Sequence, residues 1–475
     1  MICSLSLFIT YVDATILNVA LPTIQRQFHA SIASLQWVAD GYLLVLACLL
    51  MASGSTADRI GRRKVFATGL VVFSIGSLLC SVAPSISWLI AFRMLQAVGG
   101  CMLAPVSLSI VRQVFTDPKE RARALGVWSG IFGLGVACGP IAGGLLVTAV
   151  GWRSVFWVNV PIGVVASVLA RRFVPESRAP RARRVDVPGQ LLVVVLLGCL
   201  TLGVIEGPEL GWGSTWIVAP FVIAALSAVA LVLVEPRRRE PLIELRFFRS
   251  PPFSVANAVA VLSYVVLSGF LFVNTLYLQE ARGDSPLVAG VSVLPATATI
   301  AASSLLSGRL VARFGVRLPF VAGGLSFAAG SALLLDLRPA TPYAVLVASY
   351  ALLGFGLGLI NPPITNTAVT GMPPAQAGVA SAIASTARQV GSVLGVAVMG
   401  SMVTGAVAGS ATALGSGRRL DPAGAAVLTT ATHLPWEVAV ASGLICAAAA
   451  MRWTGRRGHE AAARVYVDEI PVPFS

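Results

Sequence analysis

A carboxylate stands inside one of the most apolar segments of the chain. In YVDATILNVALP, which begins at Tyr11, Asp13 is surrounded mainly by residues that favour hydrocarbon. An ionised acid at the centre of a bilayer costs about 2.5–3.5 kcal/mol by insertion scales, so an acid kept there usually has a function. Burial favours the neutral form of an acid, and a nearby cation favours its ionised form. Asp13 could therefore exchange a proton or recognise a cation. The alternative is a neutral structural acid that is hydrogen-bonded to Thr15 or to a neighbouring helix.

A second ionisable residue, Arg93, stands a short way into another apolar run, in RMLQAVGG. An arginine cannot discard its proton as a carboxylate can gain one. It therefore either extends along the helix to a nearby interface or serves as the buried partner of an acid.

The composition places these residues in a membrane. Hydrophobic residues make up 56% of the 475 residues, charged residues only 11%, and the mean hydropathy is +0.84, whereas soluble domains carry about 25% charge. We therefore expect an all-α integral membrane protein. The net charge of +14 comes without a basic amphipathic stretch or a zinc-finger spacing, so we expect no nucleic-acid partner. The seven cysteines lack paired spacing, which indicates neither disulfides nor a metal site.

Fourteen apolar stretches are long enough to be membrane spans. They lie near residues 3–22, 36–56, 65–83, 87–111, 124–148, 153–172, 187–206, 215–234, 253–278, 286–308, 317–335, 342–365, 378–403 and 435–453. Of the 34 basic residues, 26 fall in alternate loops and the C-terminal tail, 6 in the opposite loops and 2 within spans. This asymmetry predicts that both termini are cytoplasmic. The basic loops would form a cytoplasmic face that lies against anionic lipid of the inner leaflet, which accounts for the net positive charge.

Two halves of the chain align. GSTADRIGRRK, from Gly54, resembles GRLVARFGVRL, from Gly308, and GVWSGIFGLGVACG, from Gly126, resembles GVASAIASTARQVG, from Gly378. Repeats around a midplane site are typical of secondary transporters. We therefore predict six-helix bundles at residues 1–173 and 251–455. Two inserted spans with their flanking loops would occupy residues 174–250, and a cytoplasmic tail residues 456–475.

Two motifs indicate moving parts. The first is the loop GSTADRIGRRK, where glycines permit a tight reversal and charges can pair at a helix end; its candidates are Gly54, Asp58, Arg59, Gly61, Arg62 and Arg63. Positive-inside anchoring explains the arginines, but not Asp58 or the glycine spacing. The second is GIFGLGVACGPIAGG, where small residues and a proline indicate a hinge or a seal, although close packing explains some of the glycines; its candidates are Gly135, Gly139, Pro140, Gly143 and Gly144.

Polar side chains within the spans either line a substrate cavity or join helices. The candidates for a cavity are Asn18, Gln96, Asn274, Asn361, Arg388 and Gln389. Arg388 has no obvious acid nearby in the sequence, which makes it a candidate for contact with a substrate or a gate. A P-loop is absent because neither Lys64 nor Lys119 follows a glycine. No catalytic cluster stands out, so we expect neither an ATPase nor another enzyme.

These motifs together resemble the major facilitator superfamily, and specifically its fourteen-span drug:proton antiporters of the EmrB/QacA type. YVDATILNVALP, GSTADRIGRRK, RMLQAVGG, GIFGLGVACGPIAGG, GWRSVFWVNVPIG and ARQVGSVLG carry the resemblance over essentially the whole chain. It implies proton-driven efflux of a small amphipathic drug or antibiotic across the plasma membrane, by a rocker-switch and with no cofactor besides the proton gradient. It also implies that Asp13 and Arg93 couple protons, that Asp58 and Arg59 latch a cytoplasmic gate, and that Gly139 and Pro140 prevent leak.

Two other functions are compatible with parts of the sequence. One is a symporter or exporter of an endogenous metabolite on the same fold; the Gly-Pro pair of the fifth span argues against symport. The other is a membrane sensor that does not transport, which would need an output domain that the sequence does not show. We expect a monomer that handles a small molecule and protons.

Overall fold

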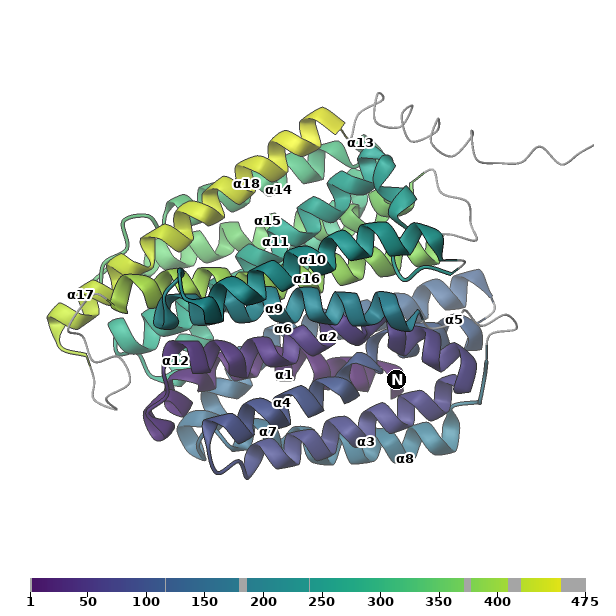
Figure 1. The fold of residues 1–475 in the computed structure, drawn as a ribbon, viewed down its shortest axis with the longest axis horizontal. Helices are drawn as coiled ribbons and strands as arrows, with labels where there is room; N and C mark the ends of the chain where they lie inside the picture. Colours follow the sequence, from purple (N-terminus) through teal and green to yellow (C-terminus); the bar gives the residue numbers. More distant parts are fainter. Residues whose placement is uncertain are drawn as a thin grey trace, which may run out of the picture.

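The structure is a computed structural model that describes residues 2–115, 117–178, 186–238, 240–370, 377–408 and 420–453. Within these ranges the regular elements are all helical (Figure 1). Their bounds are α1 Ile2–Phe28, α2 Ile32–Ile60, α3 Arg62–Ser81, α4 Ile86–Cys101, α5 Ala104–Val114, α6 Pro118–Ala149, α7 Ser154–Trp157, α8 Asn159–Phe173, α9 Val187–Leu210, α10 Thr215–Val234, η1 Glu235–Arg237, η2 Leu245–Arg249, α11 Pro251–Leu276, η3 Tyr277–Ala281, α12 Pro286–Ser292, α13 Leu294–Phe314, α14 Arg317–Ala332, α15 Tyr343–Val369, α16 Ala377–Ala408, α17 Pro422–Ala431 and α18 His433–Trp453.

Twelve helices of the described ranges are long and apolar enough to cross a membrane. Several consist of two consecutive elements, such as α4 with α5 over Ile86–Val111. Two of the fourteen predicted spans are not among the twelve. One corresponds to α6, in which the apolar stretch among residues with described side chains is Leu134–Ala149, and the other to α14, which has 16 residues and ends before a turn at residues 333–336. The prediction of fourteen spans is therefore not confirmed.

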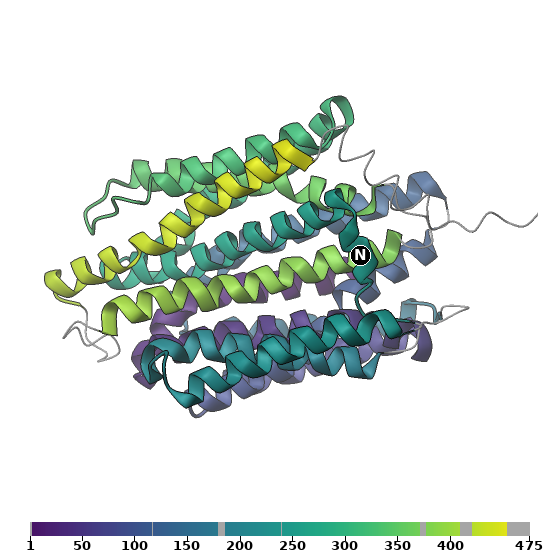
Figure 2. The same ribbon diagram turned by 45° about the horizontal axis from the view of Figure 1, so that its top comes forward.

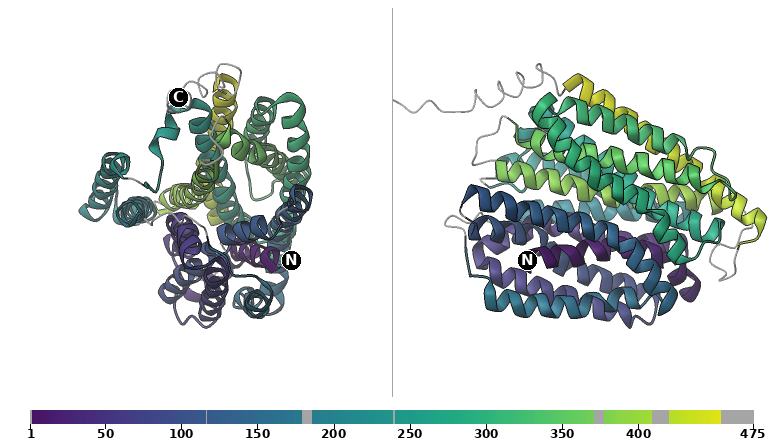
Figure 3. Two further views of the ribbon diagram at one scale, coloured as in Figure 1. Left: turned by 90° about the vertical axis from the view of Figure 1, so that its right-hand side faces the viewer. Right: turned by 180° about the vertical axis from the view of Figure 1, so that it is seen from behind.

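The helices run side by side along one direction (Figure 2). Helices α1–α8 pack mainly among themselves, through α1 with α6, α3 with α4 and α8, and α2 with α4. Helices α11–α18 do the same, through α11 with α16, α13 with α15, and α14 with α15 and α18. The two sets meet where α2 packs on α16, α6 on α12 and α13, and α1 on α11. Helices α9 and α10 pair with each other at the side of the molecule (Figure 3), and α9 packs on α2 and α16.

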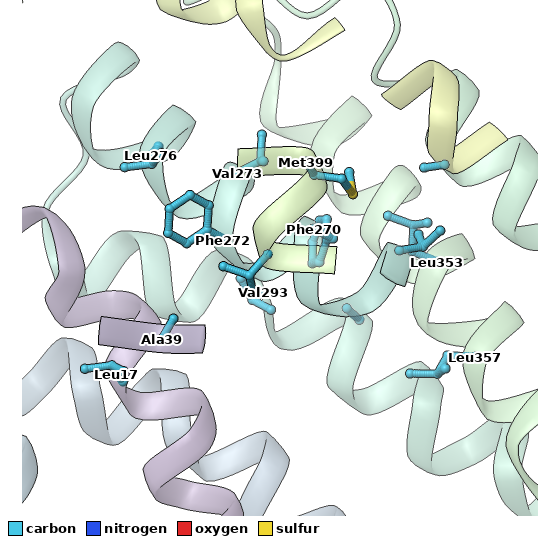
Figure 4. Close-up of a cluster of buried hydrophobic side chains, with 14 of the residues drawn as sticks. Leu17, Ala39, Phe270, Phe272, Val273, Leu276, Val293, Leu353, Leu357 and Met399 are labelled. Carbon is cyan, nitrogen blue, oxygen red and sulfur yellow. The ribbon is translucent and has the colours of Figure 1, made fainter. Parts of the chain in front are cut away.

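The largest apolar cluster extends across both sets of helices. Figure 4 shows Leu17 and Ala39 from the first set in the same cluster as Phe270, Phe272 and Met399 from the second. The ring of Phe270 packs edge-on against Tyr350, with 5.1 Å between the centroids, and also lies near Trp436. This shared core fixes the relative position of the two sets in the conformation described.

Glycines allow the closest helix contacts. A Cβ atom at Gly99 of α4 would lie 2.3 Å from the backbone nitrogen of Phe73 on α3. In the second set, Cβ atoms at Gly391 and Gly395 of α16 would each lie 2.4 Å from a carbonyl oxygen of α11. Side chains larger than hydrogen would push these helices apart, which costs packing in a membrane as in a soluble core.

We expect Gly99→Ala to lower the free energy of unfolding by about 1–3 kcal/mol, because the added methyl group meets backbone that cannot turn away. The matched control is Gly198→Ala on α9, where nothing lies within 4 Å of the added atom. Thermal unfolding of both purified variants in one detergent measures the difference. Equal melting temperatures for the two variants would contradict the close α3–α4 contact.

Candidate functional site

Asp13 is the centre of a buried polar network on four helices. Its carboxylate accepts three hydrogen bonds: from Arg93 Nη1 at 2.6 Å, from Gln96 Nε2 at 2.8 Å and from Asn159 Nδ2 at 2.7 Å. The first is also an ion pair, and all four side chains are 0–1% exposed. Asn159 Nδ2 donates as well to Ser77 Oγ at 3.1 Å. The network, defined by these five residues, joins α1, α3, α4 and α8.

Arg93 lies in this network and does not extend to an interface. Its guanidinium donates to Gln96 Oε1 at 2.7 Å and lies over the Tyr42 ring, 4.2 Å from the centroid. A cation over an aromatic face is attracted by the electron density of the ring. Of the two possibilities that the sequence left for Arg93, the structure has the pairing with an acid. Thr15, the other proposed partner of Asp13, donates instead to the Tyr11 carbonyl at 2.9 Å.

Helix geometry explains why these residues meet. Arg93 and Gln96 are three residues apart on α4 and so share one face. Asn159 is the first residue of α8, next to α7 and its buried Phe156. On α1, Val12, Ile16 and Leu17 are buried beside Asp13. Apolar packing around the carboxylate removes water, and the three donors replace the hydrogen bonds that water would supply.

Another face of α1 is partly exposed. The residues of this α1 stripe recur every three or four positions, which is one side of a helix, and they are Leu5, Phe8, Tyr11, Ala14 and Asn18. The stripe ends at Asn18. Beyond it the Val19 carbonyl accepts a hydrogen bond from Gln279 Nε2 at 2.9 Å, and Arg26 lies 3.9 Å from Glu280. The two sets of helices are therefore in direct contact at the C-terminal end of α1, whereas its N-terminal part has a partly accessible side.

The Gly-Pro motif of α6 lies in two of these contacts. Cβ atoms at Gly139 and Gly143 would lie 1.8 Å from Thr15 Oγ1 and 2.8 Å from an Ile16 side-chain carbon. On its other side, a Cβ atom at Gly144 would lie 2.6 Å from Leu287 Cα of α12. The Pro140 carbonyl packs against Gly290 of α12, and Gly135 packs against the backbone of Phe8. All five predicted motif residues thus contact α1 or α12.

The loop motif between α2 and α3 is held by charged contacts. Arg62 Nη2 donates to Asp58 Oδ1 at 2.9 Å, and Arg62 also donates to Gln113 of α5. The backbone N–H of Arg63 donates to Glu176 Oε1 at 3.1 Å. Gly61 turns the chain with a φ of 131°, a conformation that favours glycine.

Two details concern the candidate residues of this loop. Asp58 pairs with Arg62, four residues on, while Arg59 is exposed. Gly54 makes no close helix approach, since nothing lies within 4 Å of a Cβ atom built there.

The other polar candidates do not join the Asp13 network, apart from Gln96. Asn274 is buried and accepts a hydrogen bond from the Tyr350 hydroxyl, so it connects α11 to α15. Asn18 donates to the Ala14 carbonyl of its own helix. Arg388 donates to Ser385 Oγ at 2.9 Å and to Thr365 Oγ1 at 3.5 Å. The remaining two candidates, Asn361 and Gln389, are partly exposed.

Sequence reasoning missed three residues of interest. Asn159 supplies a donor to Asp13, and Tyr42 covers Arg93. Asp40 of α2 is fully buried, and neither of its carboxylate oxygens has a hydrogen-bond partner among the described residues. The criterion that identified Asp13, an acid within an apolar span, applies equally to Asp40 in WVADGY. Asn159 lies in GWRSVFWVNVPIG, one of the motifs that carry the family resemblance, and that motif could have identified it. No comparable signal in one sequence identifies Tyr42.

We expect Asp13 and Arg93 to be strongly coupled in stability. Arg93→Gln should lower the free energy of unfolding by about 3–5 kcal/mol, because it leaves a buried carboxylate without its cation. Adding Asp13→Asn to Arg93→Gln should recover part of that loss. The free energy of unfolding is measured for the wild type, both single variants and the double variant by adding a denaturing detergent to each protein in a mild one. The four values form a double-mutant cycle. Strictly additive effects would show that the two groups do not interact.

Comparisons with known proteins agree with this architecture. The family model described as Major Facilitator Superfamily matches residues 3–396. The chain is 40% identical over 399 residues to the multidrug resistance protein Stp of Mycobacterium tuberculosis, covering 84% of this chain and 74% of that protein. It is 37% identical over 388 residues to the methylenomycin A resistance protein of Streptomyces coelicolor, covering 82% of each. It is also 37% identical over 396 residues to the tetracenomycin C resistance and export protein of Streptomyces glaucescens, covering 83% and 73%.

A solved structure shares the fold. It is that of a bacterial homologue of the human lysosomal transporter Spinster, in an inward-facing and unoccupied conformation. The TM-score is 0.66 at 18% identity, and the match covers 100% of this chain and 98% of the other. The helices, the family match and the relatives together indicate a multi-pass membrane transporter of small molecules, not an enzyme. The chain belongs to the major facilitator superfamily.

Proposed function

We propose that this protein exports a small amphipathic drug or antibiotic across the plasma membrane in exchange for protons. The observation that carries the proposal is the fully buried Asp13, held by one cation and two neutral amides on the helix that also bears the partly exposed α1 stripe. The relatives named for multidrug, methylenomycin A and tetracenomycin C resistance support export of a drug. Their names argue against the alternative, a carrier of an endogenous metabolite.

The proposed organisation follows the sequence repeat. Residues 1–173 and 251–455 form two six-helix bundles, and residues 174–250 add two spans, for fourteen in all. The arginine asymmetry supports cytoplasmic termini and a basic face held against anionic lipid of the inner leaflet. With this orientation, the contacts of Val19 with Gln279 and of Gly144 with Leu287 close the outer side. The protein would act as a monomer.

The proton enters the mechanism at Asp13. When a proton from the outside binds the carboxylate, Asp13 becomes neutral and Arg93 loses its counter-ion, so the hydrogen bonds of the network must change. α1 can transmit this change, because Thr15 and Ile16 on the same helix pack on Gly139 and Gly143 of the α6 seal. Release of the proton to the cytoplasm restores the ion pair. One proton then moves inward while the substrate moves outward.

The loop motif would act as the gate on the cytoplasmic side. The Asp58–Arg62 ion pair holds the end of α2 to the start of α3. The hydrogen bond from Arg62 to Gln113 joins the end of α5 to the same cluster. Arg59 is exposed beside this cluster and is free to reach the second bundle when the cytoplasmic side closes. The gate therefore uses Arg62 as the fixed partner of Asp58 and Arg59 as the moving one.

We expect Asp13→Asn to abolish proton-driven efflux of whichever xanthene dye the wild type exports, fluorescein or rhodamine 123, because an amide cannot bind and release the proton. The matched control is Asp336→Asn, an acid that is 82% exposed and forms a surface ion pair with Arg338; it should retain full efflux. Dye retention is measured with and without a protonophore in cells with equal amounts of each protein. Efflux that a protonophore does not reduce would overturn antiport. Protonophore-sensitive efflux by Asp13→Asn would assign the proton to another acid, and Asp40→Asn tests the next one.

A further inference from the structure

A second arginine in the membrane interior has no ion-pair partner among the described residues. Among the described residues, Arg388 of α16 has two polar partners, both hydroxyl groups, at Ser385 and Thr365. A guanidinium has five N–H donors, and these two contacts leave three of them without a partner. An unpaired cation at membrane depth is costly and usually marks a functional position. Arg93, by contrast, has its charge balanced by Asp13.

Arg388 lies where accessible faces of three helices meet. α16 packs along α11, with Gly391 against Val261, and α1 packs on α11 as well. These helices carry Tyr264 on α11 and Tyr11 on α1. Tyr11 belongs to the α1 stripe, Tyr264 is partly exposed in the same way, and so are residues 385–390 of α16. Arg388 is the twelfth residue of α16, about 17 Å along it at ~1.5 Å per residue. Tyr11 is the tenth residue of α1, about 14 Å along it at ~1.5 Å per residue. The free donors of Arg388 therefore stand well inside the length of α16, on a part of it that is partly exposed.

Nearby acids do not supply the missing charge. Asp13 is committed to Arg93, Gln96 and Asn159. Neither carboxylate oxygen of Asp40 has a hydrogen-bond partner among the described residues, so Asp40 does not pair with Arg388. The surroundings of Arg388 therefore carry a positive charge. The helices beside it bear the partly exposed Tyr11 and Tyr264.

We propose that Arg388 binds an anionic group of the exported molecule, a carboxylate or an ionised phenol or enol, while Tyr11 and Tyr264 contact its aromatic or apolar body. This proposal rests on the proposed export function and specifies its substrate class. Guanidinium groups bind carboxylates through two parallel hydrogen bonds, and three free donors on Arg388 allow that geometry. The same charge repels cationic drugs, so the selectivity is opposite to that of a site lined by acids.

Two dyes with one ring system and opposite charge test the proposal. Fluorescein is an anion and rhodamine 123 a cation, and both have a xanthene core. Binding to the purified full-length protein in detergent is measured by fluorescence anisotropy. We expect the wild type to bind fluorescein more tightly than rhodamine 123. Arg388→Gln should weaken fluorescein binding by about ten- to a hundredfold, the value of hydrogen bonds to a charged group.

Further variants separate charge from folding. Arg388→Lys keeps the charge and should retain most of the fluorescein affinity, and Arg388→Glu should prefer rhodamine 123. Arg338→Gln, at an arginine whose side chain is 74% exposed, should behave as the wild type. Melting temperatures confirm that each variant is folded. The proposal is wrong if the wild type prefers rhodamine 123, if it fails to bind fluorescein, or if folded Arg388→Gln binds fluorescein as tightly as the wild type.

The outcome is distinguishable from failure of the export proposal. The binding assay has no proton gradient, so it reports on Arg388 alone. Arg388-dependent fluorescein binding, together with dye efflux that a protonophore does not reduce, would retain the anion site and remove antiport. Proton-driven rhodamine 123 efflux that Arg388→Gln leaves unchanged, together with Arg388-independent fluorescein binding, would retain antiport and remove the anion site.

Discussion

An ionised carboxylate kept out of water must find its hydrogen bonds and its counter-ion within the protein, and at Asp13 this constraint shapes the first half of the chain. Asp13 obtains three donors, and each comes from a residue distant in sequence. Their number and shortness compensate for the lost hydration. The same contacts fix α1 relative to α4 and α8, and Ser77 adds α3 through Asn159. The packing of these four helices and the charge state of one acid are therefore not independent.

α1 is the element through which this dependence can spread. Its sides have different neighbours: Asp13 faces the buried network, Thr15 and Ile16 meet the glycines of α6, and Tyr11 lies on the accessible stripe. α1 and α6 are in close contact at Gly139 and Gly143, because Cβ atoms added there would overlap atoms of α1. A small rotation or shift of α1 would thus change the packing between α6 and α12 and the exposure of the α1 stripe at the same time. A rigid helix with several tight sides transmits a local charge change better than a loosely packed one.

Hydropathy predicted the helices well, since a long apolar run in a membrane has little alternative to a helix. It also predicted the placement of Asp13 and Arg93 within spans. It did not predict which groups complete the site: Asn159 lies in a quoted motif but nothing in the motif assigns it to Asp13, and Tyr42 becomes a partner of Arg93 through tertiary packing alone. The pairing of Asp58 with Arg62 depends on the backbone turn at Gly61, which residue types allow but do not specify. Gly54 belongs to the predicted motif, yet it has no close neighbour in this conformation. α14 is shorter than the predicted span 317–335 because a turn begins at residue 333.

The two interior arginines show how context divides one residue type into two roles. Both stand on helices within apolar surroundings, and neither can lose its charge. Arg93 has an acid, an amide oxygen and an aromatic ring around it, so its attraction is satisfied within the protein. Arg388 has hydroxyl groups, which orient a guanidinium but cannot neutralise it. Charge balance in the interior is then complete around Asp13 and incomplete at Arg388. A molecule that enters beside Tyr11 and Tyr264 therefore meets one uncompensated charge, and the sign of its own charge decides how strongly it is held.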